Sequence, residues 1–186
     1  MKPAGSPQIP IIGVAGWKKS GKTTLVTRLI TEFTARGLKV ATVKHAHHAF
    51  QIDEGDTDSA RHRRAGASQV AVVSSKRWAL INELDGASEP TLDEVVAWLG
   101  PCDLIIAEGY KTAAIPKIEV RRSGAVSQDA LAGVQPNVRA IAADYSIDDN
   151  QLPVFALDDI TGIADFIAAA VRVTTPGPPA RTMPRR

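Results

Sequence analysis

The residues with the clearest chemical meaning form one short segment near the start of the chain, GWKKSGKT at positions 16–23. It matches the pattern G-x-x-x-x-G-K-[ST], whose glycines let successive backbone amides point toward phosphate oxygens. We expect Lys22 to reach the β and γ phosphates, the Thr23 hydroxyl to bind Mg²⁺, and Thr24 to contact the α phosphate. The predicted nucleotide-binding residues of this loop are Gly16, Trp17, Lys18, Lys19, Ser20, Gly21, Lys22, Thr23 and Thr24.

Two carboxylates are candidates to share the metal ion with Thr23. Glu108 ends the apolar run 103–108 and precedes Gly109, the form of a buried strand whose terminal carboxylate reaches Mg²⁺ directly or through water. Asp58 follows the second predicted strand in a polar loop, where its alternative role is to cap a helix. The predicted metal ligands are therefore Thr23, Glu108 and Asp58.

The sequence does not identify the base of the nucleotide that the loop is expected to bind. The chain lacks the Asp-x-x-Gly and Asn-Lys-x-Asp elements of conventional GTPases. Asp144, which follows the apolar run 140–143, could accept hydrogen bonds from a guanine edge, or it could be an ordinary turn residue. No catalytic base and no arginine finger can be assigned, so we expect at most slow hydrolysis.

A cluster of histidines lies at positions 44–48, with the sequence KHAHH, and holds three of the four histidines of the chain. It ends the second predicted strand, on the side of the sheet where ligands of parallel α/β folds bind. A second anionic ligand is the predicted partner of these residues, through Lys44, His45, His47 and His48. A structural zinc site is disfavoured, because Cys102 has no partner cysteine.

Apolar runs of strand length alternate with segments of helical periodicity, which predicts a layered α/β fold. A strand at 9–14, a helix that ends near Gly37 and a strand at 39–44 form a predicted βαβ unit with a parallel strand pair. Polar and apolar residues alternate at 115–121, which predicts an edge or antiparallel strand. Further strands are predicted at 69–74, 77–84, 103–108, 138–143 and 154–156, and helices at 59–65, after Thr91, and around 163–170. The expected fold is P-loop NTPase-like: a mostly parallel sheet flanked by helices, with an added antiparallel β segment.

The composition limits the class of protein, its ligands and its location. The chain has 186 residues and a net charge of +2, with no basic stripe of the kind that binds nucleic acid. No signal peptide and no apolar run of about 20 residues is present, so we expect no membrane segment and a cytoplasmic location. Residues 1–173 are expected to form a single domain, and 174–186 a disordered, basic, proline-rich tail.

Several of these strings together resemble the MobB family, the molybdopterin-guanine dinucleotide biosynthesis adaptor proteins. The resemblance covers nearly the whole chain apart from its termini and rests on 16–24, 44–48, Asp58-Ser59, 65–67, 77–80 and 108–111. It implies a P-loop fold, homodimerisation, GTP and Mg²⁺ as ligands, and weak GTP hydrolysis. It also implies association with a MobA-type nucleotidyltransferase, and contact with molybdopterin or its guanine dinucleotide.

Two other functions fit the same loop. A small-molecule kinase would need a lid with several arginines, for which Arg61, Arg63 and Arg64 form the only close cluster. A nickel-type metallochaperone GTPase would account for the histidines.

Overall fold

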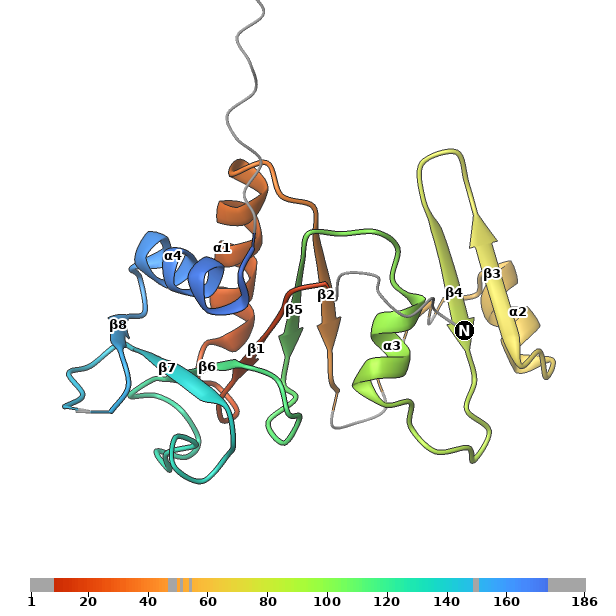
Figure 1. Ribbon diagram of the computed structural model, residues 1–186. Coiled ribbons are helices and arrows are strands. Elements are labelled where there is room, and N and C mark those ends of the chain that lie inside the picture. Colours follow the sequence, from red (N-terminus) through yellow and green to blue (C-terminus); the bar gives the residue numbers. More distant parts are fainter. Residues whose placement is uncertain (1–8, 47–49, 51, 54, 149–150, 174–186) are drawn as a thin grey trace, which may run out of the picture. The chain divides into compact units, whose positions relative to one another are not determined.

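A computed structural model describes residues 9–46, 50, 52–53, 55–148 and 151–173 of the chain (Figure 1). These residues form two compact units. The first unit consists of Met1–His45 and Val96–Arg186, and the second of Ala46–Val95. The predicted boundaries of a domain at 1–173 and a tail at 174–186 stay predictions, and the tail lies outside the described residues.

The first unit is built on a six-stranded sheet in the order β2-β5-β1-β6-β7-β8. All neighbouring strands are parallel. The strands are β1 (Ile11–Ala15), β2 (Val40–Lys44), β5 (Leu104–Glu108), β6 (Lys117–Arg121), β7 (Val138–Ala143) and β8 (Val154–Ala156). Because parallel strands end at the same edge, the residues that follow β1, β2, β5, β6 and β7 gather along one side of the sheet.

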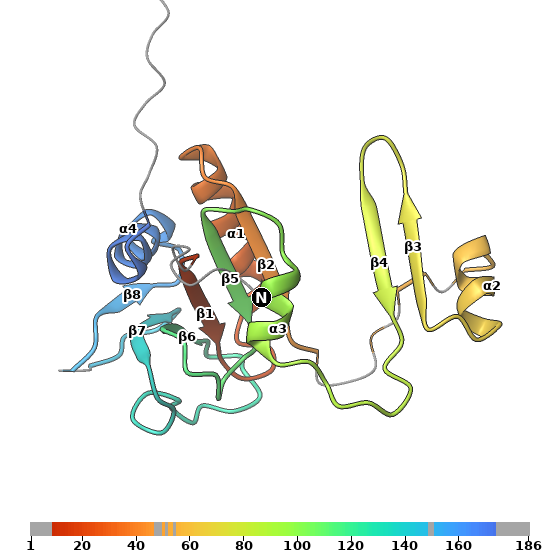
Figure 2. The ribbon, with the colours of Figure 1, turned by 45° about the vertical axis from the view of Figure 1, so that its right-hand side comes forward.

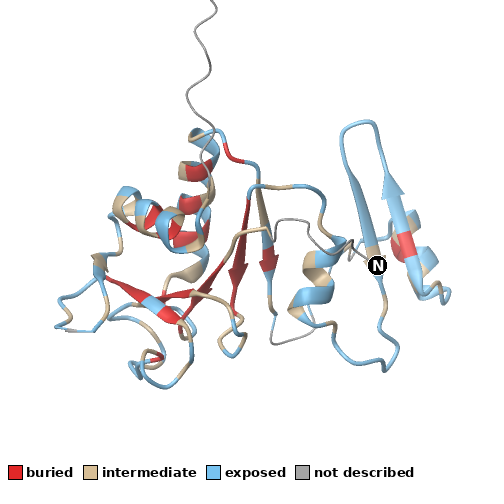
Figure 3. Cartoon of the chain, in the orientation of Figure 1, coloured by how far each residue is buried: buried red, intermediate tan, exposed pale blue. Residues whose placement is uncertain are grey.

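Two helices of this unit, α1 (Lys22–Ala35) and α4 (Ile160–Val171), lie side by side against the sheet (Figures 1 and 2). Their apolar faces pack on β1, β5, β6 and β7 in one continuous core. Figure 3 shows this burial along the strands and on the inner sides of both helices. Leu25, Leu29 and Phe33 of α1 are almost fully buried, which confirms the helical stripe expected from the sequence. The core thus fixes the start of α1 against the end of β1.

Two expectations about strand neighbours are wrong. The strands of the predicted βαβ unit are not paired with each other, because β5 lies between β1 and β2. The strand predicted as an edge or antiparallel element is β6, an interior parallel strand between β1 and β7. Its polar residues Lys117 and Glu119 are buried and hydrogen-bonded instead of facing water, so their alternation does not mark a solvated face.

The second unit contains α2 (Asp58–Arg64) and the antiparallel hairpin β3 (Gln69–Val73) and β4 (Trp78–Asn82). This hairpin is the added antiparallel segment predicted from the sequence. Helix α3 (Leu92–Trp98) spans the boundary between the units. The helix predicted after Thr91 is confirmed, and a capping box begins it: Thr91 N donates to Glu94 Oε2 (2.8 Å), and Glu94 N donates to Thr91 Oγ1 (3.3 Å).

Within the described ranges, no helix is long and apolar enough to cross a membrane.

Candidate functional site

The glycine-rich segment connects β1 to α1 and leaves the start of the helix open. Gly21 is the N-cap residue, with φ of 93°, and no side chain of the described chain caps the helix. The first amides of a helix have no acceptor within the helix, and the helix dipole makes this end positive. The start of α1 therefore offers free donors to an anion.

The interior of the loop is tightly packed around Gly16. A Cβ added at Gly16 would lie 2.5 Å from both Ser20 Oγ and the Val120 carbonyl oxygen, so a side chain cannot be accommodated. Ser20 is fully buried, and its hydroxyl has no hydrogen-bond partner among the residues described. Lys19 adopts a left-handed conformation, with φ of 66°, that costs a non-glycine residue roughly 1 kcal/mol or more. A buried, unpartnered hydroxyl and a strained backbone at one loop are features of a site shaped for a ligand.

Lys22 folds back across the loop. Its Nζ donates a hydrogen bond to the Trp17 carbonyl oxygen (2.8 Å). Burial lowers the pKa of Lys22; the nearby carboxylate of Glu108 acts in the opposite direction, and the charges of Lys111 and Lys44 lower the pKa further. A negatively charged ligand in the loop would relieve this concentration of positive charge.

The register of the sheet brings Glu108 to the loop, as the sequence predicted. Val14 and Lys44 are the Cα partners of Glu108 on its two neighbouring strands. The Thr23 hydroxyl donates to Glu108 Oε1 (2.7 Å), and Lys44 Nζ lies 3.4 Å from the same oxygen. Hydroxyl and carboxylate oxygens are ligands that Mg²⁺ prefers, so the donor set of Thr23 and Glu108 fits this ion. These two predicted metal ligands are adjacent.

Glu108 is followed by a sharp exit from the sheet at Gly109, which has φ of 101°. A Cβ at Gly109 would lie 3.2 Å from the carbonyl oxygen of His45, so the ends of β5 and β2 meet closely here. His45 N donates to the Glu108 carbonyl oxygen (2.9 Å), and its ring centroid lies 5.2 Å from that of Tyr110. Lys44 and His45 are therefore next to the loop.

The other two histidines predicted to bind an anion, His47 and His48, lie outside the described residues. Among the described residues, no group of three or more histidine, cysteine or acidic side chains is arranged to hold a metal ion.

Asp58, the third predicted metal ligand, belongs to the second unit. It is the first residue of α2, its side chain is 92% exposed, and its Oδ1 lies 3.9 Å from Arg61 Nη1. Its assignment as a metal ligand stays a prediction.

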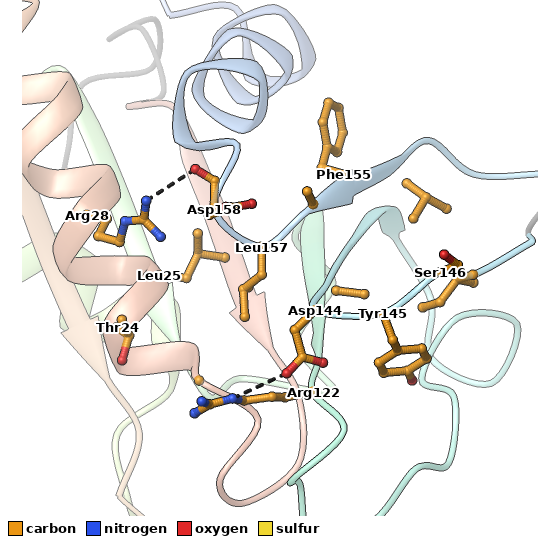
Figure 4. A pocket seen from close by; sticks show the side chains of 15 residues that line it. Thr24, Leu25, Arg28, Arg122, Asp144, Tyr145, Ser146, Phe155, Leu157 and Asp158 are labelled. Carbon is orange, nitrogen blue, oxygen red and sulfur yellow. Dashed lines mark hydrogen bonds and ion pairs between the residues drawn. The ribbon is translucent and has the colours of Figure 1, made fainter.

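Two cavities adjoin the start of α1. A cavity of about 570 Å³ is lined by the loop itself, including Lys19, Lys22 and Thr23. A larger cavity of about 800 Å³ continues from Gly21 and Thr24 to the ends of β7 and β8, where Tyr145, Phe155 and Leu157 form its walls (Figure 4). The second cavity has apolar walls with a few polar groups, as pockets for aromatic ligand groups usually do.

Asp144 lines the larger cavity, which is where a base-contacting residue is expected. Its Oδ1 accepts a hydrogen bond from Ser123 N (2.8 Å), and its Oδ2 accepts one from Ser123 Oγ (3.2 Å). Arg28, on the opposite side of the cavity, donates to the Asp158 carbonyl oxygen (3.2 Å), as Figure 4 shows. Contact between Asp144 and a base stays a prediction.

The structure adds two cations that the sequence reasoning did not place at the site. Lys111 Nζ lies 3.9 Å from the centroid of the Trp17 ring, a cation–π contact that joins the segment after β5 to the loop. Arg122 lines both cavities. The position of Lys111 three residues after Glu108 was a usable signal; Arg122 had none, because its strand was expected at an edge.

A buried carboxylate holds the connection that follows β6. Glu119 is 1% exposed and accepts hydrogen bonds from the amides of Leu131 and Ala132 (2.8 Å each) and from both Nε and Nη2 of Arg121 (2.8 and 2.9 Å). The connection after β6 also contacts the glycine-rich loop, because Trp17 Nε1 donates a hydrogen bond to the Asp129 carbonyl oxygen (2.7 Å).

A parallel sheet, a glycine-rich loop after its inner strand β1, an open helix start and a carboxylate on the neighbouring strand define the P-loop class of α/β proteins. Within that class, the chain belongs to the MobB family: the family described as "Molybdopterin guanine dinucleotide synthesis protein B" matches residues 11–144.

Curated relatives agree with this assignment. The "Molybdopterin-guanine dinucleotide biosynthesis adapter protein" of Escherichia coli (strain K12) is 37% identical over 166 residues, which cover 88% of this chain and 94% of that protein. The protein of the same description from Haemophilus influenzae is 36% identical, over 86% of this chain and 88% of that protein.

Solved structures agree as well. The crystal structure of molybdopterin-guanine biosynthesis protein B has a TM-score of 0.69 and 29% identity, over 87% of this chain and 99% of that one. Bacillus subtilis MobB has a TM-score of 0.70 and 26% identity, over 88% and 98% of the two chains.

Proposed function

We propose that this chain binds GTP with Mg²⁺ in the loop 16–24 and acts as an adaptor in the biosynthesis of molybdopterin-guanine dinucleotide. The observation that carries the nucleotide proposal is the pair formed by Thr23 and Glu108, 2.7 Å apart beside an uncapped helix start. In this arrangement the loop amides and Lys22 would hold the phosphates, and Thr23 and Glu108 would hold Mg²⁺. The bound ion would supply neutralisation of the triphosphate charge.

The biosynthetic role rests on family membership and on the names of the relatives. A MobA-type nucleotidyltransferase is the proposed partner, in the cytoplasm. Molybdopterin carries a phosphate, and Lys44 brings a positive charge to the edge directly beside the proposed nucleotide site, where His45 follows it. We assign the second anionic ligand to Lys44 and His45 at this edge; the contribution predicted for His47 and His48 lies outside the described residues.

Hydrolysis of the bound nucleotide should be slow. Glu108 accepts a hydrogen bond from the Thr23 hydroxyl and lies beside Lys44, which leaves this carboxylate poorly suited to activate a water. A rate of many turnovers per second by the purified protein alone would contradict this.

Homodimerisation is supported by an apolar surface on the second unit. Val73 pairs with Trp78 and Ala71 with Leu80, so these four residues share one face of the β3–β4 hairpin. Val73, Trp78 and Leu80 are 76%, 69% and 54% exposed. A two-stranded hairpin is marginally stable by itself. We propose that a second copy of the chain covers this hairpin face.

Calorimetric titration of the purified protein with GTP and ATP, with and without Mg²⁺, tests the nucleotide proposal. We expect Mg²⁺-dependent binding of GTP, and a loss of about tenfold or more in the Lys22→Ala variant, because its charged amine makes charge-assisted hydrogen bonds to phosphate. Lys76→Ala, at an exposed lysine between β3 and β4, is the matched control. Equal affinities of the Lys22→Ala variant and the parent would refute the proposal.

A further inference from the structure

Arg122 occupies the junction between the two cavities beside the loop. It directly follows β6, which neighbours β1, so the sheet brings it to the edge where the phosphate loop lies. The cavities share Gly21, Thr24 and Arg122. Figure 4 shows its side chain extending beneath Thr24, at the start of α1.

The guanidinium is anchored at one end and open at the other. Arg122 Nε lies 3.4 Å from Asp144 Oδ2, while the Arg122 side chain as a whole is 56% exposed. A guanidinium has five N–H donors, and Nε carries one of them. Its two terminal nitrogens make no hydrogen bond with the described residues, so four donors remain available to a ligand in the cavities.

The backbone around Arg122 is fixed to the phosphate loop. Ala125 N and Gln128 Nε2 both donate to the Arg122 carbonyl oxygen (3.0 Å each), which closes a tight turn. Val126 N, within the same turn, donates to the Lys18 carbonyl oxygen (3.0 Å). These hydrogen bonds fix the backbone at Arg122 relative to the phosphate loop.

Arg122 reaches the phosphate loop from another element than the lysines that surround Lys22. The charges that act on Lys22 are those of Glu108, Lys111 and Lys44, on the side of the metal ligands. Arg122 lines the smaller cavity together with Lys19 and Lys22, but unlike them it also lines the larger cavity, as does Thr24, the residue expected to contact the α phosphate. Arg122 thus lies where the space for the phosphates meets the larger cavity.

We propose that Arg122 binds the α-phosphate of the nucleotide, with Asp144 as the residue that positions it. This inference deepens the proposed nucleotide function and rests on it. A guanidinium pairs with two phosphate oxygens at once, which fixes the nucleotide at the point where its base enters the larger cavity. Asp144 balances the charge of Arg122 before a ligand arrives.

The test compares Arg122→Ala and Arg122→Lys with the parent protein in titrations with GTP, GDP and guanosine. Arg139→Ala, at an exposed arginine of β7 outside both cavities, is the matched control. We expect Arg122→Ala to weaken GTP and GDP binding by the same factor, about tenfold or more, and to leave guanosine binding unchanged. The lysine variant should lose less, because it keeps the charge but not the paired geometry.

Three results would overturn the assignment: unchanged GTP affinity in Arg122→Ala, an equal loss for guanosine, or a loss for GTP without one for GDP. The second would place Arg122 on the base, and the third on the γ-phosphate. Failure of the proposed function is distinguishable, because then the parent itself binds neither GTP nor GDP. Thermal unfolding of each variant verifies that it is folded.

Discussion

The replacement Glu108→Gln is the sharpest test of the proposal that Glu108 helps to hold Mg²⁺. It keeps the shape of the side chain and a carbonyl oxygen next to Thr23, but it removes the negative charge. Because that charge attracts a cation and repels phosphate, the two ligands of the site should respond in opposite directions. We expect Mg²⁺-dependent GTP binding to weaken, and GTP binding without Mg²⁺ to remain equal or become tighter.

The size of the effect follows from the contact between Thr23 and Glu108. Their oxygens are 2.7 Å apart. A Mg²⁺ ion at about 2.1 Å from the threonine oxygen lies within about 5 Å of the carboxylate oxygen. At that separation, the attraction between charges of +2 and −1 is about 1.7 kcal/mol in water and about 7 kcal/mol at an effective dielectric constant of 20. Even the smaller value corresponds to a loss of more than about tenfold in Mg²⁺ affinity.

The assay is a titration of GTP into protein at a series of Mg²⁺ concentrations and in EDTA. Glu32→Gln is the control, because Glu32 pairs with Arg36 on the surface of α1 and takes no part in the site. An unfolded Glu108→Gln protein would lose binding under both conditions, so the opposite responses also exclude a merely structural effect. The reasoning is refuted if the variant and the parent show the same Mg²⁺ dependence. If Asp58→Asn shows the loss instead, the carboxylate ligand comes from the second unit.

Three further predictions concern the base, the scaffold and the second unit. Asp144→Asn should weaken GTP binding by about tenfold or more and ATP binding less, in parallel titrations. An amide cannot accept both guanine N–H donors, whereas ATP loses only the pairing that positions Arg122. Equal losses would show that Asp144 positions Arg122 but does not select the base. Glu119→Gln should lower the free energy of unfolding, measured by urea denaturation, by about 3–5 kcal/mol, because it breaks a buried ion pair and leaves a backbone amide unsatisfied. The surface change Glu32→Gln, as the control, should cost at most about 1 kcal/mol. Similar losses for the two glutamates would contradict the buried role. Trp78→Glu should convert a dimer into a monomer in sedimentation experiments, and Trp98→Glu, at another exposed tryptophan, should not; an unchanged dimer would remove the hairpin face from the interface.

The phosphate loop was predictable because its requirements are local. The positions of Gly16, Gly21 and Lys22 are set by one backbone turn and one helix start, and the sequence carries both signals. Glu108 was predictable for a related reason: a buried strand that ends in a carboxylate and a glycine must deliver that carboxylate to the edge of a parallel sheet. The strands on either side of β5 were not predictable, because no local sequence pattern indicates that β5 lies between β1 and β2.

The error at β6 shows why the rest of the site was missed. Alternation of polar and apolar residues predicts a strand with one wet face, but here the polar residues satisfy backbone groups inside the protein. Lys117 donates to the carbonyl oxygens of Ile115 and Pro136 (3.1 and 2.9 Å), and Glu119 accepts two amides. Such pairing depends on segments distant in sequence, so a local pattern cannot reveal it. An edge strand would have delivered its last residues to the periphery of the sheet. An interior strand beside β1 must deliver its last residues to the edge of the sheet where the glycine-rich loop lies. The position of Arg122 at this edge therefore follows from the strand order, although no sequence motif contains Arg122.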